Sequence, residues 1–309
     1  MARILVTGAS GLLGANLVLE AADAGHQVIA ASHIHPVASG EVETCVADLI
    51  RPGEAQRLLE ASWPEWVIHC AALTDLDLCE TNPSLAYRLN TEMAGAVARA
   101  CQVVGARLLH ISTDAVFDGR RGGYVEEDVP APVNVYGKSK LAGEEEVTRA
   151  DPAALIVRTN FFGWSAQATR GLAEWFLSGL EDGRERPGFT DVWVTPILVN
   201  DLSRLLLKML EAGLSGVYHV PGADCVSKYA FGARLARAFG LDPMLVTRAS
   251  VEGGQLAARR GRQLCLQAIR LLRAIEIDLP GLDDGLTRLR DLRRTGFLDR
   301  LRGLVRSRA

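Results

Sequence analysis

Short apolar runs alternate with amphipathic stretches along the first 160 residues of the chain. The runs that predict buried strands lie at 3–7, 27–31, 44–47, 66–70, 108–112 and 154–159. The stretches that predict helices lie at 12–23, 54–62, 83–105 and from 135 onward. Strands and helices that alternate at this spacing predict an α/β fold with a doubly wound parallel Rossmann sheet.

The alternation becomes less regular after residue 159. The predicted elements there are a helix near 171–180, a turn-rich stretch at 181–189, a strand and a helix over 192–211, a strand at 216–220 and a helix at 228–239. We expect residues 1–160 and 192–220 to form a dinucleotide-binding domain. Residues 161–191 and 221–309 would then form a smaller, discontinuous C-terminal substrate-binding lobe, with the substrate in the cleft between the two.

The last 24 residues combine a leucine stripe with a strong positive charge. Residues 286–309 hold eight arginines and two aspartates, and leucines stand at 286, 289, 292, 298, 301 and 304. Such a tail can bind an anionic partner or a membrane surface. A solvated helix that packs its leucine face on the rest of the protein is the favoured interpretation.

Composition changes this picture little. The chain has 309 residues, 48% of them hydrophobic, and a net charge of −3, which is an ordinary globular balance and gives no electrostatic reason to expect a nucleic-acid partner. No apolar run approaches the roughly 20 residues of a membrane span, and the N-terminus leads directly into a strand, so no signal peptide is expected. The six cysteines show no C-x-x-C spacing, which predicts reduced thiols in a cytoplasmic protein without a disulfide or a metal site. Cys70 and Cys101 stand in apolar surroundings and are predicted to be core residues.

A glycine-rich turn follows the first predicted strand. Gly8, Gly11 and Gly14 are spaced G-x-x-G-x-x-G, which suits a tight turn that brings a pyrophosphate to the N-terminus of the following helix. After the second strand, Ser32 and His33 take the place where an acidic residue would bind the ribose of NAD. This substitution favours NADPH, with NADH as the alternative, although no arginine lies nearby in the sequence to hold the 2′-phosphate.

Three further side chains suggest acid–base chemistry at the carboxyl end of the fifth predicted strand. Thr113 ends that strand, and Tyr136 and Lys140 are four residues apart on the next helix, so they share one face. A lysine charge at ~4 Å and an effective dielectric of ~20 contributes at most roughly 4 kcal/mol, equivalent to about three pKa units. The helix dipole adds up to ~1 kcal/mol. We therefore expect the pKa of Tyr136 to lie well below its usual ~10.

Five sequence motifs carry a resemblance to a known family. They are V-T-G-A-S-G-L-L-G at 6–14, H-C-A-A-L-T-D-L-D-L-C-E at 69–80, H-I-S-T-D-A-V-F-D-G at 110–119, N-V-Y-G-K-S-K-L-A-G-E-E at 134–145 and I-V-R-T-N at 156–160. In this order they resemble the extended short-chain dehydrogenase/reductases, and within them the dTDP-4-dehydrorhamnose reductase group. The resemblance implies that Tyr136 protonates the substrate carbonyl oxygen as hydride arrives, that Thr113 hydrogen-bonds this oxygen, and that Lys140 binds the nicotinamide ribose.

The resemblance also suggests which residues contact ligands. The predicted cofactor-binding residues are Gly8, Ser10, Gly11, Leu12, Leu13, Gly14, Ser32, His33, Asp48, Leu49, Ala71, Ala72, Asn90 and Lys140. The predicted substrate-binding residues are Thr74, Leu76, Thr113, Asp114 and Phe161. Phe161 stands where many reductases of this group have a tryptophan, which keeps sugar stacking but loses the indole donor.

The predicted activity is therefore NAD(P)H-dependent reduction of a nucleotide-linked 4-keto-6-deoxysugar. A nucleotide-sugar epimerase of the same family, with tightly held NAD, is one alternative. A dehydratase is disfavoured because Asp114 is followed by Ala115, where dehydratases resemble one another in having Asp-Glu. A non-catalytic subunit that resembles the regulatory subunit of methionine adenosyltransferase is the other alternative. A homodimer is expected, without the intersubunit magnesium of some family members, because the first helix lacks the acidic residues that bind it.

Overall fold

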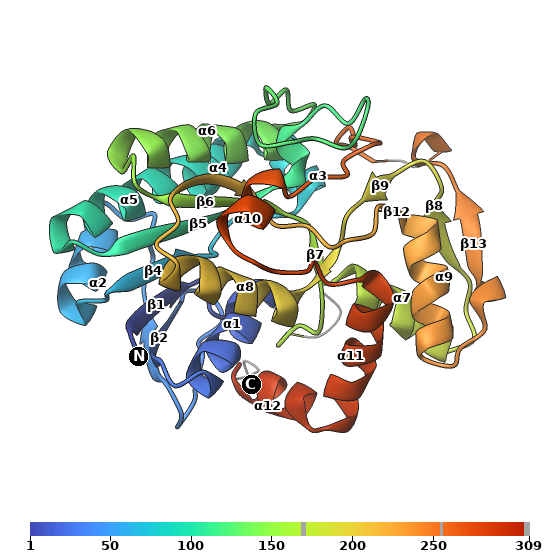
Figure 1. Cartoon of the computed structure of the whole chain (residues 1–309), viewed down its shortest axis with the longest axis horizontal. Helices are drawn as coiled ribbons and strands as arrows, with labels where there is room; N and C mark the ends of the chain where they lie inside the picture. The colour runs from blue at the N-terminus through green and yellow to red at the C-terminus, as the bar shows by residue number, and fades with distance from the viewer. Residues whose placement is uncertain (168–170, 254–255, 306–309) are drawn as a thin grey trace.

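A seven-stranded parallel sheet forms the centre of the protein (Figure 1). The computed structural model describes residues 1–167, 171–253 and 256–305. The strands are β1 (Arg3–Thr7), β2 (Gln27–Ser32), β3 (Glu43–Val46), β4 (Trp66–His69), β5 (Arg107–Thr113), β6 (Leu155–Thr159) and β11 (Gly216–His219). Their order across the sheet is β11-β6-β5-β4-β1-β2-β3, which confirms the predicted doubly wound α/β fold.

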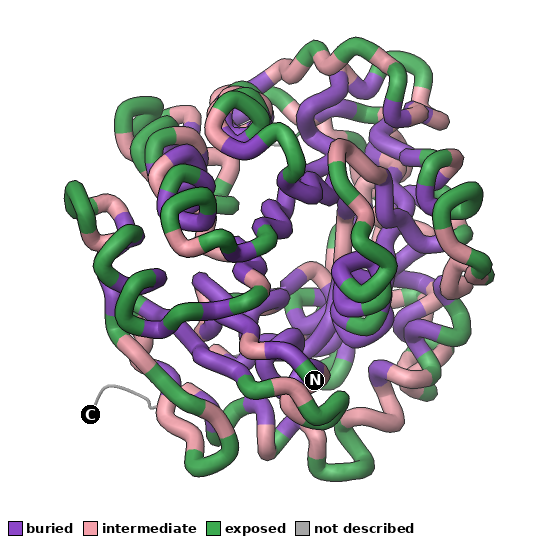
Figure 2. The backbone as a smooth tube through the Cα atoms, turned by 60° about the vertical axis from the view of Figure 1, so that its left-hand side comes forward, coloured by how far each residue is buried: buried purple, intermediate pink, exposed green. Residues whose placement is uncertain are grey.

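Helices cover both faces of the sheet because each strand sends alternate side chains to opposite sides. In β1, Ile4 and Val6 belong to one apolar core and Leu5 to the other. The first core lies beneath α1 (Leu12–Asp23) and α8 (Val199–Glu211), which pack against each other. The second core lies beneath α2 (Glu54–Ser62), α5 (Met93–Val104) and α6 (Val135–Ala150). Buried residues accordingly gather in the strands and on the inner helix faces, as Figure 2 shows.

The long helix predicted at 83–105 is helical throughout but irregular. It comprises α4 (Pro83–Tyr87), a π-helical turn η1 (Arg88–Glu92) and α5. Another short helix, α3 (Leu76–Thr81), precedes it. The π-turn places Asn90 towards α6, where its side chain donates to Ser139 Oγ at 2.9 Å. Such single π-turns within a helix are frequent near functional sites.

Smaller strand pairs form beyond the carboxyl ends of the sheet strands. β8 (Arg186–Phe189) pairs with β13 (Val246–Ala249), and β9 (Trp193–Val194) pairs with β12 (Val226–Ser227). Helices α7 (Leu172–Glu181) and α9 (Lys228–Ala238) pack against each other beside them. The sequence predicted only turns at 181–189, because the partner of β8 lies some 60 residues further along the chain. The division into a cofactor domain and a discontinuous lobe stays a prediction.

The C-terminal leucine stripe packs into the protein. Helices α11 (Leu282–Arg294) and α12 (Phe297–Gly303) follow the short helix α10 (Ile269–Ala274). The buried leucines of the stripe are Leu286, Leu289, Leu298, Leu301 and Leu304. This confirms the packed-helix interpretation for the described part of the tail; residues 306–309 lie outside the described residues. None of the helices in the described ranges is both long and apolar enough to cross a membrane.

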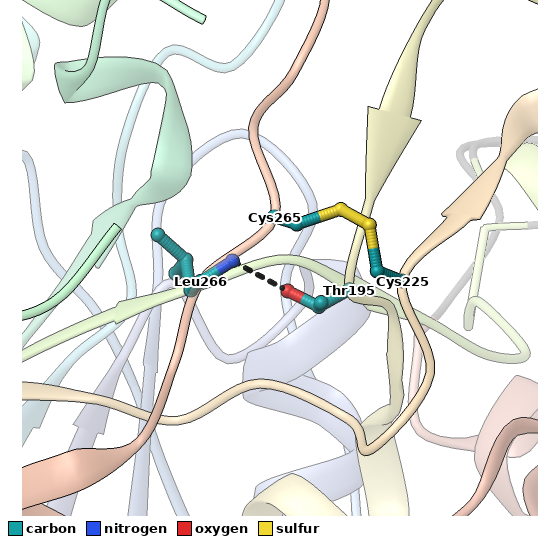
Figure 3. The surroundings of a disulfide bond; sticks show 4 residues. All are labelled: Thr195, Cys225, Cys265 and Leu266. Carbon is teal, nitrogen blue, oxygen red and sulfur yellow. Dashed lines mark hydrogen bonds between the residues drawn. A yellow bond between two sulfur atoms is a disulfide. The ribbon is translucent and has the colours of Figure 1, made fainter. Parts of the chain in front are cut away.

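One cysteine pair contradicts the prediction of reduced thiols. Cys225 and Cys265 form a disulfide, with their Cα atoms 5.6 Å apart (Figure 3). Next to the bond, the Leu266 amide donates to Thr195 Oγ1 at 3.2 Å, which fixes the same segment a second time. The sequence could not reveal the pair, because its members are 40 residues apart and meet only through the folding of two loops. Cys101 is buried in the second core as predicted, whereas Cys70 is only partly buried and packs against the first core.

Candidate active site

The turn between β1 and α1 needs glycine for steric reasons. Gly8 has φ +66°, and a Cβ atom on it would lie 2.7 Å from the amide nitrogen of Ala71. A Cβ atom on Gly14 would lie 2.2 Å from the carbonyl oxygen of Gly8. Gly11 is the N-cap of α1 and donates its N–H to the Gly8 carbonyl at 2.9 Å. The turn therefore leads directly into the N-terminus of α1; binding of a pyrophosphate there stays a prediction.

The predicted hydroxyl of the catalytic trio lies at the carboxyl end of β5. Thr113 ends the strand, and its Oγ1 donates to Asp114 Oδ1 at 3.0 Å and accepts the Ala115 N–H at 3.1 Å. Asn160 donates to the second carboxylate oxygen of Asp114 at 2.8 Å. Burial raises the pKa of Asp114 to about 6, although these hydrogen bonds act in the opposite direction. The Thr113 hydroxyl also acts on the phenol of Tyr136, whose pKa it lowers.

Helix α6 supplies the other two members of the trio. Asn134 caps its N-terminus, since its side chain accepts the Gly137 N–H at 2.8 Å. Tyr136 and Lys140 follow on one face of the helix, and both side chains line the same cavity as Thr113. The structure thus brings together the three residues of the predicted trio.

The electrostatics of the tyrosine differ from our expectation. Burial raises the pKa of the Tyr136 phenol above its usual value, and the charge of Asp114 acts in the same direction. The Lys140 ammonium donates to the Ile111 carbonyl oxygen at 2.7 Å instead of acting on the phenol. Burial in turn lowers the pKa of Lys140 to about 8. The sequence argument was wrong because it counted the ammonium charge and left out the cost of burying both groups.

A cavity of about 750 Å³ joins the glycine turn to the trio. Such a volume is typical of a site for a small molecule or cofactor. The predicted ligand residues that line it are Gly8, Gly11, Leu12, Leu13, Gly14, Ala72, Thr74, Leu76, Thr113, Asp114, Tyr136, Lys140 and Phe161. The nicotinamide end of the predicted cofactor site and the predicted substrate site therefore share one cavity.

The predicted adenosine end lies outside this cavity, at the ends of β2 and β3. Ser32 is buried, and its Oγ accepts the Val37 N–H at 3.2 Å. Asp48 Oδ2 lies 3.1 Å from Arg51 Nε and 3.8 Å from His33 Nε2. The sequence indicated no arginine near Ser32 and His33, but the fold brings Arg51 to this place through their shared neighbour Asp48.

Four other predicted cofactor residues also lie outside the cavity lining: Ser10, Leu49, Ala71 and Asn90. Leu49 is buried in the core. Asn90 accepts the Leu73 N–H at 2.8 Å and donates to the Leu73 carbonyl oxygen at 3.0 Å, so its side chain supports the loop after β4. Direct cofactor contacts by these four residues stay a prediction.

The cavity is also lined by two cations that the sequence analysis missed. Lys228 opens α9, and Arg260 lies in the segment before Cys265. Arg260 Nη2 donates to Asp77 at 3.0 Å, while its buried Nη1 has no hydrogen-bond partner among the described residues. Burial lowers the pKa of Lys228, and the charge of Asp114 acts in the opposite direction. No local motif marks either residue, because long-range packing places both of them in the cavity.

A phosphate-binding turn and a Thr–Tyr–Lys trio in one cavity define the protein class. The protein is an NAD(P)-dependent oxidoreductase of the short-chain dehydrogenase/reductase type. The model of the family described as RmlD substrate binding domain matches residues 2–292, and the chain belongs to this family. This confirms the family resemblance carried by the five sequence motifs.

Named relatives include reductases and the beta subunit of methionine adenosyltransferase 2. A probable low-salt glycan biosynthesis reductase, Agl14 of Haloferax volcanii, is 34% identical over 92% of this chain and 96% of its own. A dTDP-4-dehydrorhamnose reductase of Mycobacterium tuberculosis is 36% identical over 79% of this chain and 78% of its own. Methionine adenosyltransferase 2 subunit beta of Pongo abelii is 30% identical over 87% and 81%.

A solved structure supports the same family assignment. The dTDP-4-dehydrorhamnose reductase of Bacillus anthracis, solved in complex with NADP, superimposes with a TM-score of 0.81. It is 29% identical and matches 94% of this chain and 99% of its own. The similarity thus extends over nearly the whole length of both proteins.

Proposed function

We propose that this protein reduces the 4-keto group of a nucleotide-linked 6-deoxysugar, such as dTDP-4-dehydrorhamnose, with NADPH as the hydride donor. The observation that carries the proposal is the convergence of Thr113, Tyr136 and Lys140 on the cavity that the glycine turn also lines. The names of the reductase relatives support the choice of substrate.

The residues fit a dinucleotide and the acid–base half of a reduction. When bound, the cofactor supplies hydride from its nicotinamide ring. Tyr136 gives its phenolic proton to the carbonyl oxygen, and the Thr113 hydroxyl hydrogen-bonds that oxygen during the transfer. The Lys140 ammonium holds the nicotinamide ribose through one of its N–H donors.

The preference for NADPH rests on the charges at the end of β2. An acidic side chain at position 32 would repel a 2′-phosphate, but this position is occupied by the uncharged Ser32. Arg51 and His33 both lie close to Oδ2 of Asp48 and supply a guanidinium and an imidazole for the phosphate. NADH remains the alternative donor.

Lys228 and Arg260 complement an anionic substrate. Both line the cavity that also contains Asp114 and Tyr136, and they add positive charge to it. A nucleotide sugar carries a diphosphate, which such donors bind well. The predicted homodimer and the cytoplasmic location stay predictions.

The direct test is to incubate the protein with NADPH and a panel of dTDP-, UDP- and GDP-linked 4-keto-6-deoxysugars. NADPH consumption is measured as the loss of nicotinamide absorbance. We expect turnover with at least one of them and none with the corresponding 4-hydroxy sugars. Tyr136→Phe is the matched control, since it should bind NADPH and remain inactive. Absence of turnover with every keto-sugar would refute the proposal. Cofactor that stays bound through each cycle, with conversion of one sugar epimer into another, would indicate the epimerase instead.

The similarity to methionine adenosyltransferase 2 subunit beta supports a second candidate function, that of a regulatory subunit. In that case the protein would bind a partner enzyme and change its activity. Co-purification with a methionine adenosyltransferase, together with inactivity towards every keto-sugar, would favour this candidate. Retention of Thr113, Tyr136 and Lys140 in one cavity favours the reductase.

A further inference from the structure

The Lys140 ammonium is held from behind by two acceptors. Its Nζ donates to the Ile111 carbonyl oxygen at 2.7 Å and lies 3.3 Å from Nε2 of His110. An ammonium group has three N–H donors and no lone pair, so the nitrogen of His110 must be the acceptor. Two donors are thereby engaged, and Lys140 still lines the cavity with a third available for the cofactor.

This contact defines the tautomer of His110. Because Nε2 accepts, the ring carries its hydrogen on Nδ1, and this buried nitrogen has no partner among the described residues. Burial and the charge of Lys140 hold the pKa of His110 well below its usual value, so the ring is neutral. A buried donor without a partner costs free energy, and a core position would be filled more favourably by an apolar ring.

A second histidine, His69, is a natural control for His110, because it is packed similarly but does not hydrogen-bond Lys140. His69 stacks on His110, with ring centroids 5.4 Å apart, and is equally buried. Its Nδ1 pairs with Thr7 Oγ1 at 2.7 Å, and its Nε2 has no hydrogen-bond partner among the described residues. The pair thus contains one ring that hydrogen-bonds the ammonium and one that does not.

We propose that His110 is a positioning residue for the reduction: it fixes the Lys140 ammonium on the cavity wall so that one N–H stays directed at the cofactor ribose. Acceptance of this hydrogen bond also stabilises the charged form of Lys140 against the cost of its burial. The role requires a neutral acceptor, which His110 supplies because its own protonation is suppressed.

The other charged or titratable groups around Lys140 do not replace this acceptor. Glu144 and Cys70 act on its charge through space and favour the ammonium form. Glu144 is itself paired with Arg158, whose Nη2 lies 2.7 Å from Oε2, and it accepts the Ser112 hydroxyl. His69 is neutral as well, since burial lowers its pKa to about 3.

The test compares His110→Phe with the matched control His69→Phe, and uses His110→Gln as the conservative variant that retains an acceptor. Binding of NADPH alone is measured by fluorescence from pH 6 to 10 on the full-length protein. In the wild type, binding should weaken as pH rises through the pKa of Lys140, about 8. We call this loss of binding at high pH the alkaline limb. In His110→Phe the pH of the alkaline limb should be lower by about one unit, because the charged form of Lys140 has lost a hydrogen bond.

The two control variants give the inference its discriminating power. His69→Phe should keep the wild-type limb, and His110→Gln should restore most of it. If His110→Phe does not fold, His110→Met removes the acceptor with a more adaptable side chain. A limb that stays in place in the acceptor-free variant, or moves equally in His69→Phe, would overturn the inference. The inference rests on the proposed cofactor site, and because the assay contains no sugar, its outcome is independent of the proposed substrate.

Discussion

Removal of the Cys225–Cys265 disulfide should destabilise the protein by an amount that follows from its position in the chain. The bond closes a loop with a sequence separation of 40 residues. In the chain-entropy model, a loop of this length restricts the unfolded state by about 4 kcal/mol at 25 °C. We therefore expect Cys225→Ser to lower the free energy of unfolding by about that amount.

Urea unfolding measured with and without dithiothreitol tests this value. The wild-type midpoint should fall on reduction, whereas the Cys225→Ser midpoint should not respond. Cys45→Ser is the matched control, because Cys45 is a free cysteine and its replacement leaves the loop closed. Thiol titration of the denatured, unreduced protein should find four thiols, the number of free cysteines. Six thiols, or a midpoint that dithiothreitol leaves unchanged, would refute the reasoning.

Four further substitutions test other parts of the structure. Tyr136→Phe should bind NADPH normally and lose at least ~10²-fold in kcat, measured by steady-state kinetics, because the proton donor is gone; near-full turnover would contradict its role. Arg51→Met should reduce the preference for NADPH over NADH in kcat/KM, and an unchanged ratio would exclude Arg51 from the 2′-phosphate site. Arg158→Met leaves Glu144 buried without its guanidinium partner and should cost roughly 3–5 kcal/mol in urea unfolding; a loss below 1 kcal/mol would show that the pair contributes little. Lys228→Met should raise the KM for the nucleotide sugar with little change in the Kd of NADPH, and the reverse pattern would place Lys228 on the cofactor side.

The sequence predicted those features that depend on local pattern. The sheet strands have apolar runs that end in turns, and Tyr136 and Lys140 share a helix face through their spacing alone. The glycine turn follows from the same local chemistry. These elements supply one wall of the cavity and all three members of the trio.

The features that the sequence did not predict depend on burial and on contacts between residues that are far apart in the chain. Arg260 reaches the cavity, and Cys265 meets Cys225, only after segments far apart in the chain have come together. The direction of the Tyr136 pKa shift depends on the balance between burial and charge, and neither quantity can be derived from spacing along a helix. The histidine pair behind Lys140 was likewise hidden, since each member stands in an ordinary apolar strand.

Residues of and just after α12 contact two early parts of the chain, the segment after β2 and the end of α1. The Ala38 amide, just after β2, donates to the Leu304 carbonyl oxygen at 2.7 Å, and Val37 forms a bridge with Val305. Arg300 of α12 pairs with Asp23, at the end of α1. During synthesis, the contacts of α1 and of the segment after β2 with α12 can therefore form only after more than 250 further residues have been added. Removal of α12 would expose the ends of these two early elements, although they are distant from it in the sequence.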